Sequence, residues 1–392
     1  MLLGETAMRE WLCPVQEQCG GCQWLRLPYE KQLEKKQQRV EKLLKPFCMV
    51  RPIVGAANRF HYRNKVHAAI GTDRQGHVVC GSYAAGTHRI VPVSQCLIED
   101  ERAAQVVQAV RRLMVRFRLP PYNEDSGQGV LRHVLVRVGR QTGQVLVTLV
   151  IGRPEFPARR AFVEALVKSC PFITTVVVNL NGFRTSMILG RSSRIAYGKG
   201  YIEDVLCGKR FGISPASFYQ VNAEQTEKLY QIVLGYMALS GRENLLDAYC
   251  GIGTIGLAAA DLAAQVTGVE LNPDAVQDAI RNARRNQVEN ARFVEADAGD
   301  FMRRLARQNQ RPDVVVMDPP RAGSDERFLA ALCRLAPARV VYVSCMPETL
   351  ARDLGYLTAH GYCAQEAMPV DMFPQTEHVE TVCLLTRKRP SQ

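Results

Sequence analysis

The stretch Leu245-Leu-Asp-Ala-Tyr-Cys-Gly-Ile-Gly-Thr-Ile-Gly256 decides the fold of this 392-residue chain. Its first residues form an apolar, strand-sized run, its middle is a turn of the form Gly-x-Gly-x-x-Gly, and an Ala-rich segment of helical character follows. Such a turn lets a nucleotide cofactor approach the backbone closely, and it serves sites for NAD, FAD and S-adenosylmethionine. The stretch therefore predicts a strand, turn and helix that bind a nucleotide-containing cofactor, without choosing among the three.

The same rhythm of strand, turn and helix continues from about residue 213 to the C-terminus. Further strands are expected at 265–269, 314–317 and 339–343, and a helix is expected at 274–285. A βαβ series predicts a doubly wound sheet with its site at the carboxyl ends of the strands. We therefore expect an α/β domain over residues 213–392.

The residues before 213 have a different pattern. A helix is predicted from Tyr29 to about Lys45, and further helices near 100–118 and 157–168. Short β-like runs are separated by turn residues, at 65–70, 78–83, 130–138, 144–151, 174–179 and 186–189. This mixture is typical of an α+β domain dominated by antiparallel strands. The predicted division is a segment 1–50, an α+β domain 51–212 and the α/β domain 213–392.

Charge divides the chain in a similar way. Residues 1–212 contain 32 Lys and Arg against 16 Asp and Glu, a net +16, whereas residues 213–392 have 18 against 22, a net −4. A basic half beside a slightly acidic half suggests a polyanion-binding module next to a domain with another task. The alternative is that these cations only solvate helix faces, and the lysines and arginines of the helix at 29–45 fit that interpretation well.

The apolar runs and the cysteines bear on location. The longest apolar runs are strand-sized, far below the ~18 residues of a membrane span, and Met1–Glu5 shows no secretory signal. We therefore expect a cytoplasmic protein without membrane attachment. A monomer is a separate expectation. The chain has 13 cysteines, an odd number that, without a secretion signal, argues against a disulfide framework. A metal or a reactive thiol is the better expectation.

The neighbours of the glycine turn narrow the choice of cofactor. Asp247 precedes the turn, as in the first motif of methyltransferases, and Glu270 ends the next strand, where it would accept hydrogen bonds from ribose hydroxyls. Asp318-Pro-Pro320 ends the fourth strand, a position at which methyltransferases that act on bases place a similar motif. A plain turn is the alternative for Asp-Pro-Pro. NAD dehydrogenases have no reason to repeat this feature, so S-adenosylmethionine is favoured.

A cysteine and a carboxylate occur in the same series. Cys345 follows the strand at 339–343, and Glu377-His-Val-Glu-Thr-Val382 leads into the last strand. Carbon 5 of a pyrimidine becomes nucleophilic when a thiolate adds to carbon 6, and a base must then remove the C5 proton. A lone cysteine at a strand end is more often buried packing, but the whole assembly favours pyrimidine C5 methylation.

The chain resembles the RNA uracil-C5 methyltransferase family in five ordered motifs over residues 214–386. These motifs are Phe218-Tyr-Gln-Val-Asn222, Asp247-Ala-Tyr-Cys-Gly-Ile-Gly-Thr-Ile-Gly256, Asp318-Pro-Pro-Arg-Ala-Gly323, Tyr342-Val-Ser-Cys345 and Glu377-His-Val-Glu-Thr-Val382. The resemblance implies a Rossmann-like S-adenosylmethionine-dependent methyltransferase domain preceded by a basic α+β, RNA-binding domain. The family usually has Asn after the nucleophile, and here Met346 stands there.

The resemblance also implies roles for individual residues. Cys345 would be the nucleophile and Glu380 the proton acceptor. Contacts with S-adenosylmethionine would come from Gln220, Tyr249, Glu270 and Asp318. Cytosine-C5 methylation is the competing reaction, but RNA cytosine enzymes generally keep a second Cys beside the motif-four Asp-Pro. Met317-Asp-Pro-Pro-Arg321 has no thiol, so uracil is preferred.

Four cysteines form a separate candidate site, at Cys13, Cys19, Cys22 and Cys96. Their spacing leaves zinc and iron–sulfur both open. The resemblance implies a [4Fe–4S] cluster, completed by Cys96, in the segment 1–50. It also favours 23S ribosomal RNA as substrate. Transfer RNA is the alternative substrate, and a catalytically silent RNA-binding protein on a methyltransferase fold is the alternative without activity.

Overall fold

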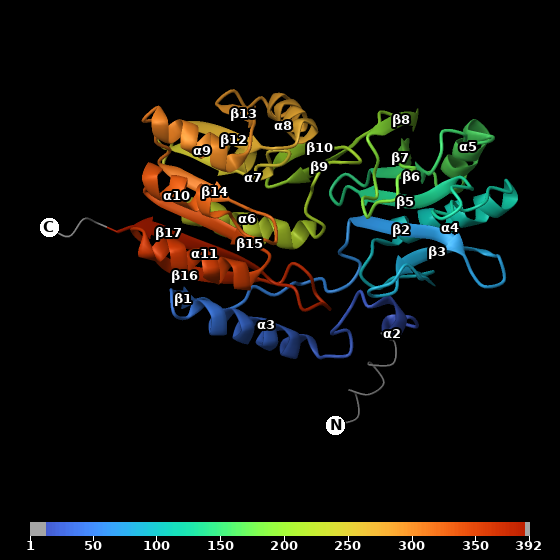
Figure 1. Cartoon of the computed structure of the whole chain (residues 1–392), viewed down its shortest axis with the longest axis horizontal. Helices are drawn as coiled ribbons and strands as arrows, with labels where there is room; N and C mark the ends of the chain where they lie inside the picture. Colours follow the sequence, from blue (N-terminus) through green and yellow to red (C-terminus); the bar gives the residue numbers. More distant parts are fainter. Residues whose placement is uncertain (1–12, 389–392) are drawn as a thin grey trace. The chain divides into compact units, whose positions relative to one another are not determined.

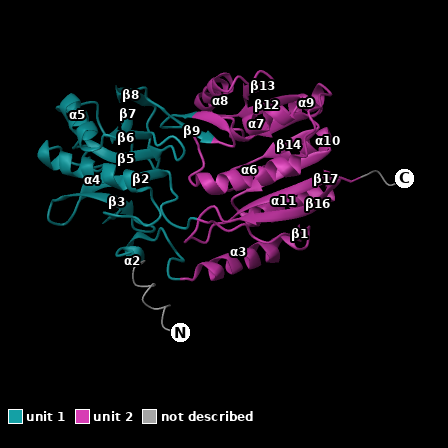
Figure 2. Ribbon diagram, turned by 180° about the vertical axis from the view of Figure 1, so that it is seen from behind, with its two compact units in different colours: residues 1–26, 58–205, 212–216 teal, residues 27–57, 206–211, 217–392 magenta. Residues whose placement is uncertain are grey.

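The computed structural model describes residues 13–388 of the chain (Figure 1). The chain forms two compact units (Figure 2). Unit 1 takes residues 1–26, 58–205 and 212–216, and unit 2 takes residues 27–57, 206–211 and 217–392. Both units are built around a β-sheet, and each is described by itself.

Unit 1 contains a seven-stranded sheet in the order β4-β3-β2-β5-β6-β7-β8. The strands are β2 (Lys65–Thr72), β3 (Val78–Tyr83), β4 (Ile90–Pro92), β5 (Leu131–Val138), β6 (Val145–Ile151), β7 (Ile173–Leu180) and β8 (Ser192–Tyr197). All pairs are antiparallel except β6 with β7, which are parallel. The parallel pair is joined by helix α5 (Arg159–Ser169), as a crossover requires. The predicted α+β architecture with mostly antiparallel strands is therefore confirmed.

The sequence explains why this sheet has a buried centre. Every residue of β5 and β6 is buried, as expected of strands covered on both faces. Helix α4 (Glu101–Arg116) begins at Asp100, whose side chain accepts a hydrogen bond from the Arg102 N–H. Its apolar residues recur at helical spacing and join the strands in one core. A short helix, α2 (Gln16–Cys19), lies at the start of the described residues.

One predicted strand, at 186–189, is wrong. The run Met187-Ile188-Leu189 is apolar, but the backbone there does not pair with another strand. The Asn181 side chain donates to the carbonyl oxygens of Met187 and Ile188, at 2.7 and 3.0 Å. These side-chain bonds replace a strand ladder, and the strand at this edge of the sheet is β8 instead.

A hairpin follows β8 in the chain. Strands β9 (Ile202–Leu206) and β10 (Lys209–Ile213) form a two-stranded sheet. The two residues between them, Cys207 and Gly208, both have positive φ, at 48° and 72°. Positive φ at both central positions is the signature of a type I′ turn, whose twist matches that of paired strands.

Unit 2 contains an eight-stranded sheet in the order β1-β16-β17-β15-β14-β11-β12-β13. The strands are β1 (Met49–Val50), β11 (Asn244–Ala248), β12 (Gln265–Glu270), β13 (Ala291–Glu295), β14 (Val314–Met317), β15 (Arg339–Ser344), β16 (Tyr362–Val370) and β17 (Glu380–Arg387). The helices are α3 (Tyr29–Leu44), α6 (Ala223–Met237), α7 (Thr254–Ala259), α8 (Pro273–Arg285), α9 (Ala298–Arg307), α10 (Glu326–Leu335) and α11 (Pro347–Ala359), with a 3₁₀ turn at Ala260–Leu262. Only β17 runs antiparallel to its neighbours, β15 and β16. This Rossmann-like sheet confirms the predicted fold class.

Helix α3 belongs to unit 2, although the sequence suggested grouping it with the N-terminal cysteines. The reason is its buried face, which includes Gln32, Lys36, Val40 and Leu44. Val40 and Leu44 join the core of unit 2. The helix contacts α11, β16 and β1, so residues 27–57 pack with the α/β sheet rather than with residues 13–26.

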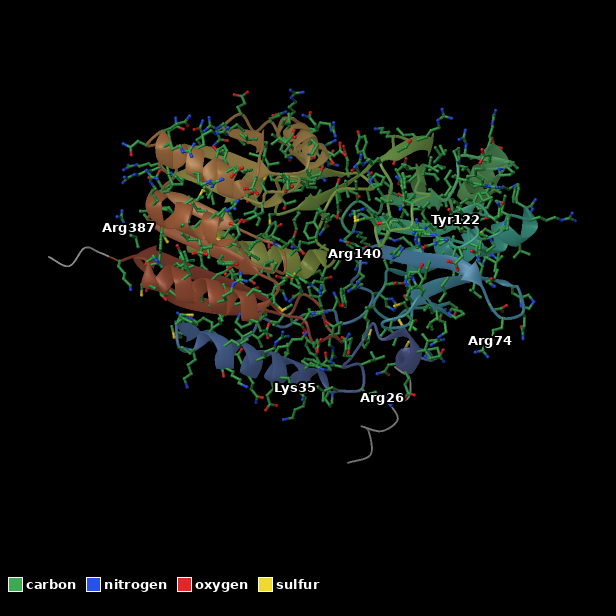
Figure 3. The ribbon with its side chains drawn as sticks, viewed as in Figure 1. Arg26, Lys35, Arg74, Tyr122, Arg140 and Arg387 are labelled. Atoms are coloured by element: carbon green, nitrogen blue, oxygen red, sulfur yellow. The ribbon has the colours of Figure 1, made fainter. Side chains whose placement is uncertain are left out.

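A buried ion pair fixes this helix. Lys36 Nζ lies 2.6 Å from Asp371 Oδ1, and both side chains are fully buried. Lys36 Nζ also donates to the Phe373 carbonyl at 3.1 Å, and the Tyr29 hydroxyl donates to Asp371 Oδ2 at 2.8 Å. The preceding residue, Lys35, points outward from the ribbon (Figure 3) and is exposed.

The unit boundaries change the charge division. Unit 1 has 23 Lys and Arg against 13 Asp and Glu, a net +10, and unit 2 has 27 against 25, a net +2. Three of the six cations in the region of α3 form ion pairs within unit 2: Lys31 with Glu34, Lys36 with Asp371 and Arg39 with Glu348. Of the net +16 of residues 1–212, +10 lies in unit 1 and +6 lies in the segments 27–57 and 206–211 of unit 2, where part of it serves internal pairing.

We predict that Lys36→Met lowers the free energy of unfolding by about 3–5 kcal/mol, because it leaves the Asp371 carboxylate buried without its cation. Lys35→Ala removes the neighbouring exposed cation and should change stability by no more than about 0.5 kcal/mol. Urea unfolding followed by far-ultraviolet circular dichroism measures both. Equal stability of the two variants would contradict a structural role for the buried pair.

Candidate active site

The predicted cofactor and catalytic residues of unit 2 converge on one edge of its sheet. Tyr249 follows β11, Glu270 ends β12, Asp318 follows β14 and Cys345 follows β15. These four strands are parallel, so their carboxyl ends meet at the same edge. Glu380 is the first residue of β17, which runs in the opposite direction, and its start therefore lies at this edge too.

The strand register sets Cys345 beside Glu380. Ser344 in β15 is paired with Thr381 in β17. The residue after Ser344 and the residue before Thr381 therefore meet across the two strands. Cys345 is partly exposed, whereas Glu380 is 5% exposed. The edge thus presents an accessible thiol next to a buried carboxyl group.

The glycine turn has the geometry of a cofactor cradle. Gly253 has φ of 82° and caps α7, and Gly256 donates its N–H to Asp247 Oδ2 at 2.8 Å. A Cβ on Gly256 would lie 3.0 Å from Asp247 and Val266, so this glycine allows close packing of the helix on the strands. A Cβ on Gly251 would meet nothing within 4 Å, which means that this side of the turn is open to a ligand.

Three of the residues expected to contact the cofactor lie around this turn. Glu270 Oε2 accepts the Gly251 N–H at 3.0 Å, and Oε1 accepts the Asn272 N–H at 2.8 Å. Tyr249 has φ of 66°, and its hydroxyl lies 3.4 Å from the Ser324 hydroxyl. Asp318 is partly buried in the same region, and loss of solvent around its carboxyl group raises its pKa to about 7.

The fourth of these residues, Gln220, comes from a different segment. It is 8% exposed and lies two residues before Asn222, the N-cap of α6. Asn222 accepts a hydrogen bond from the Gln225 N–H and donates one to the Met372 carbonyl. The segment that contains Gln220 is therefore anchored in unit 2, close in sequence to a well-capped helix.

The ionisation of the thiol and the carboxyl group is strongly shifted. Burial, the Glu380 carboxyl and the Asp318 carboxyl raise the pKa of Cys345 to about 11. Burial and Asp318 raise the pKa of Glu380 to about 8. Both groups are therefore largely protonated at neutral pH in the free protein.

Arg321, to which no role was assigned from the sequence, places a positive charge near the thiol and the carboxyl group. Its positive charge lowers the pKa of both Cys345 and Glu380, against the effects of burial. Its backbone is held by α11, because the Thr349 hydroxyl lies 3.2 Å from the Arg321 carbonyl oxygen. The signal was present in the sequence, since Arg321 completes the Asp-Pro-Pro-Arg motif.

The turn after Cys345 is fixed without an asparagine. The Met346 N–H donates to the Ser344 hydroxyl at 3.2 Å, and this hydroxyl donates to the Met346 carbonyl at 3.0 Å. The Thr349 hydroxyl also lies 3.0 Å from that carbonyl. Hydroxyl groups on both sides of Met346 therefore hold the backbone where the family usually has Asn.

The four cysteines of the predicted cluster all belong to unit 1. Burial and the neighbouring Cys19 and Cys13 raise the pKa of Cys22 to about 11. Burial, then Glu99 and more weakly Cys22, raise the pKa of Cys96 to about 12. The thiols are close enough to influence one another, and four thiols suit a thiophilic metal. However, nowhere within residues 13–388 do three His, Cys, Asp or Glu side chains form a group that could hold a metal ion.

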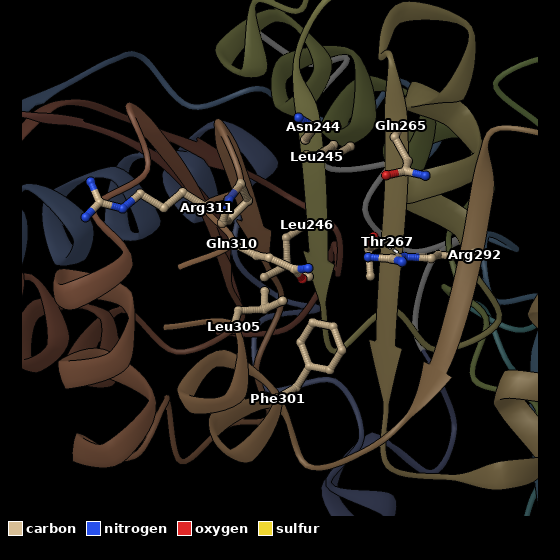
Figure 4. Close-up of a pocket in the computed structure, with 11 residues that line it drawn as sticks. Asn244, Leu245, Leu246, Gln265, Thr267, Arg292, Phe301, Leu305, Gln310 and Arg311 are labelled. Atoms are coloured by element: carbon tan, nitrogen blue, oxygen red, sulfur yellow. Dashed lines mark hydrogen bonds between the residues drawn. The ribbon is translucent and has the colours of Figure 1, made fainter. Parts of the chain in front are cut away.

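A hollow of about 360 Å³ lies at the other edge of the unit 2 sheet (Figure 4). Its lining includes Asn244 and Gln265, the first residues of β11 and β12, together with Phe301 and Leu305 of α9. It therefore opens at the amino ends of the strands, away from Cys345, and holds none of the predicted site residues.

Among the helices of the described part of the chain, none is long and apolar enough to cross a membrane.

Comparison with known proteins gives a consistent result. The profile of the family described as tRNA (Uracil-5-)-methyltransferase matches residues 28–388. A Bacillus cereus protein described as an uncharacterized RNA methyltransferase is 42% identical over 96% of this chain and 82% of its own length. A Staphylococcus aureus protein with a similar description is 41% identical over 96% of this chain and 84% of its own.

A solved structure agrees with these relatives. The crystal structure of Pyrococcus abyssi tRNA (uracil-54, C5)-methyltransferase in complex with S-adenosyl-L-homocysteine is 28% identical, with a TM-score of 0.79. The similarity covers 93% of this chain and 86% of that one. The predicted enzyme class, an S-adenosylmethionine-dependent RNA (uracil-5-)-methyltransferase, is confirmed. The chain belongs to the tRNA (uracil-5-)-methyltransferase family.

Proposed function

We propose that this protein methylates C5 of a specific uridine in RNA, with Cys345 as nucleophile and Glu380 as proton acceptor. One observation carries the proposal. The pairing of Ser344 with Thr381 brings the thiol and the carboxyl group together at the sheet edge that also holds the glycine turn. Nucleophile, base and methyl donor are needed at one place for C5 methylation.

The chemistry assigns one task to each residue. S-adenosylmethionine supplies the methyl group, and Gln220, Tyr249, Glu270 and Asp318 would hold it. The Cys345 thiolate forms a bond with C6 of the uracil, and the electron pair displaced to C5 makes that carbon nucleophilic. After C5 has accepted the methyl group, Glu380 takes the C5 proton. The electrons of that C–H bond restore the C5–C6 double bond, and the Cys345–C6 bond breaks.

Base flipping fits the geometry of this edge. The Cys345 thiol is partly buried and Glu380 is almost fully buried. A uracil stacked in RNA cannot reach such groups, so the target nucleotide must rotate out of its stack into the site. Burial of an uncharged base costs little, whereas the neighbouring anionic phosphates would stay outside.

The RNA substrate is a separate part of the proposal. The cysteine pattern and its resemblance support 23S ribosomal RNA. Transfer RNA is the second candidate, since the Pyrococcus abyssi structure is of a tRNA (uracil-54, C5)-methyltransferase. Unit 1, with its net +10, is proposed as the main RNA-binding surface because cations there can neutralise phosphates. A cytoplasmic location and a monomeric state stay predictions.

We also propose that Cys13, Cys19, Cys22 and Cys96 hold a [4Fe–4S] cluster. The raised pKa of Cys22, to which Cys19 and Cys13 contribute after burial, supports this, because closely spaced thiolates repel one another unless a metal ion neutralises them. The four sulfur atoms do not form a metal-holding group as they lie, so cluster binding would have to bring them together. The cluster would brace the irregular segment before α3.

We predict that Glu380→Gln accumulates a covalent protein–RNA adduct, because addition and methyl transfer can proceed while proton removal cannot. Incubation with total cellular RNA, followed by denaturing electrophoresis and sequencing of the attached RNA, measures the adduct and identifies the target. Cys345→Ala/Glu380→Gln is the matched control and should form none. An adduct on transfer RNA would replace the ribosomal assignment, and undiminished turnover without adduct would contradict the role of Glu380.

We predict that Arg321→Ala shifts the pH–rate profile to higher pH. Both Cys345 and Glu380 must lose a proton for turnover, and Arg321 lowers the pKa of both. Without Arg321 both pKa values rise, so kcat/KM begins to increase at a higher pH than in the native enzyme. Arg321→Lys keeps the charge and should shift the profile less. A profile of unchanged position in Arg321→Ala would show that this charge does not act on the reacting groups.

We predict that protein purified without oxygen is brown, absorbs broadly near ~400 nm and contains about four iron atoms per chain. Cys22→Ser or Cys96→Ser should remove the colour and the iron. Cys207→Ser is the matched control, because Cys207 lies in the β9–β10 turn and should leave both unchanged. One zinc per chain and no iron after anaerobic purification would reject the cluster in favour of a zinc site.

A further inference from the structure

Two loops next to the catalytic pair are joined by a single side chain from the other end of the sequence. Strand pairing fixes β15 up to Ser344 and β17 from Glu380 onward. The residues just after Cys345 and just before Glu380 lie outside the ladder. The Arg39 guanidinium of α3 reaches both of these segments, 309 and 338 positions away in sequence.

Arg39 contacts the segment that follows the nucleophile, residues 346–348, here called the nucleophile loop. Its Nε and Nη2 donate to the two carboxylate oxygens of Glu348, both at 2.9 Å. Nη2 also lies 3.9 Å from Met346 Sδ. Glu348 is in the first turn of α11, three residues after Cys345. This bidentate arrangement fixes the direction of the guanidinium as well as its distance.

The remaining contact of Arg39 is with the loop that carries the base. Nη1 donates to the Glu377 carbonyl at 3.2 Å, three residues before Glu380. Because this carbonyl belongs to the backbone, the bond constrains the position of the chain just before β17, the strand that begins at Glu380. Arg39 therefore connects the two loops whose ends hold the reacting side chains.

Helix α3 is anchored to the loop before β17 at several further points. Lys36 binds Asp371 and the Phe373 carbonyl, one turn before Arg39. Gln32, one turn earlier, donates to Gln375 Oε1 at 2.9 Å and accepts the Gln375 N–H at 2.9 Å. Gln32, Lys36 and Arg39 are spaced along one face of the helix. The loop from 371 to 377 is thus bound to α3 at successive points.

We propose that Arg39 is a positioning residue for methyl transfer, holding the Cys345 and Glu380 loops at a fixed separation. The inference rests on the proposed function, in which the thiol acts on C6 and the carboxylate on C5 of one ring. Because C5 and C6 are adjacent ring atoms, the thiol and the carboxylate must hold fixed positions relative to each other. A misplacement of about 1 Å can cost roughly a hundredfold in rate.

A purely structural ion pair is the competing explanation. The Arg39 and Glu348 side chains are 33% and 46% exposed, and exposed ion pairs usually contribute little to stability. Because of this exposure, removal of Arg39 should leave the fold and the cofactor turn nearly intact. An effect confined to turnover would therefore come from the two loops.

The test compares Arg39→Ala and Arg39→Lys with the full-length native enzyme. We expect kcat on substrate RNA to fall roughly 10- to 100-fold in Arg39→Ala, with KM for S-adenosylmethionine and the melting temperature almost unchanged. Arg39→Lys should recover only part of the rate, because an ammonium group cannot bind carboxylate and carbonyl in the same fixed fork. Lys42→Ala, which removes an exposed cation from the same helix, is the matched control and should behave as the native enzyme.

RNA with 5-fluorouridine at the target position provides a second readout. Fluorine cannot leave C5 as a proton, so the native enzyme should stop at the methylated Cys345 adduct. The rate of adduct formation then reports the steps up to methyl transfer, which depend on the nucleophile loop, and it does not include the final proton removal. In Arg39→Ala we expect this rate to fall together with kcat, because the same side chain fixes both loops.

The outcomes separate this inference from the proposed function. A native enzyme that neither methylates RNA nor forms the fluorouridine adduct would overturn the proposed function itself. A native enzyme that does both, with Arg39→Ala equal to it in kcat and adduct formation, would overturn only the role of Arg39. Loss of S-adenosylmethionine binding or of thermal stability in parallel with kcat would also reject positioning, in favour of a structural ion pair. In the Arg39→Ala background Glu348→Ala should add little further loss, since the two residues act as one unit.

Discussion

The antiparallel pairing of β17 with β15 is the interaction on which the proposed catalytic edge depends. The pairs β15–β14, β14–β11, β11–β12 and β12–β13 of the unit 2 sheet are all parallel, and β17 is antiparallel to both of its neighbours, β15 and β16. If β17 were parallel too, its first residue would lie at the opposite edge from Cys345. Reversal of this one strand brings an acid from its start to a thiol at the end of its partner. A register slip of one residue would turn the Glu380 side chain to the other face of the sheet.

Burial raises the pKa values of the carboxyl groups at this edge and makes their ionisation unfavourable. Asp247 and Glu380 are buried and Asp318 is partly buried, and loss of solvent is the largest cause of the raised pKa of each carboxyl group. Carboxyl groups so close together resist ionisation, because each charge is unfavourable for the next. Arg321 and the N–H of Gly256 act in the opposite direction. The site is therefore poised between protonated and ionised forms, as acid–base chemistry near neutral pH requires.

The sequence allowed much of this to be predicted, and the reasons are local. The glycine turn, the strand ends at Glu270 and Asp318 and the helix at 29–45 each depend on a few neighbouring residues with strong backbone preferences. The strand at 186–189 was wrong because a short apolar run cannot reveal that Asn181 binds its carbonyl groups. The place of α3 in unit 2 and the contacts of Arg39 could not be predicted either. They depend on residues more than 300 positions away, and the pattern of a single helix says only that one face is buried.

The joining of α3 to the loop at 371–377 also has a consequence for synthesis. Lys36 is translated early, yet its partner Asp371 lies 335 residues later, and β17 comes later still. Until the ribosome has released nearly the whole chain, the buried face of α3 and the gap between β15 and β16 have no partner. Such long-range closure is slow compared with local helix formation and leaves apolar surface open to aggregation in the meantime. The edge that holds Cys345 and Glu380 is therefore completed only when β17 has been made, and premature termination before β17 leaves a chain without Glu380 and with an unpaired strand edge.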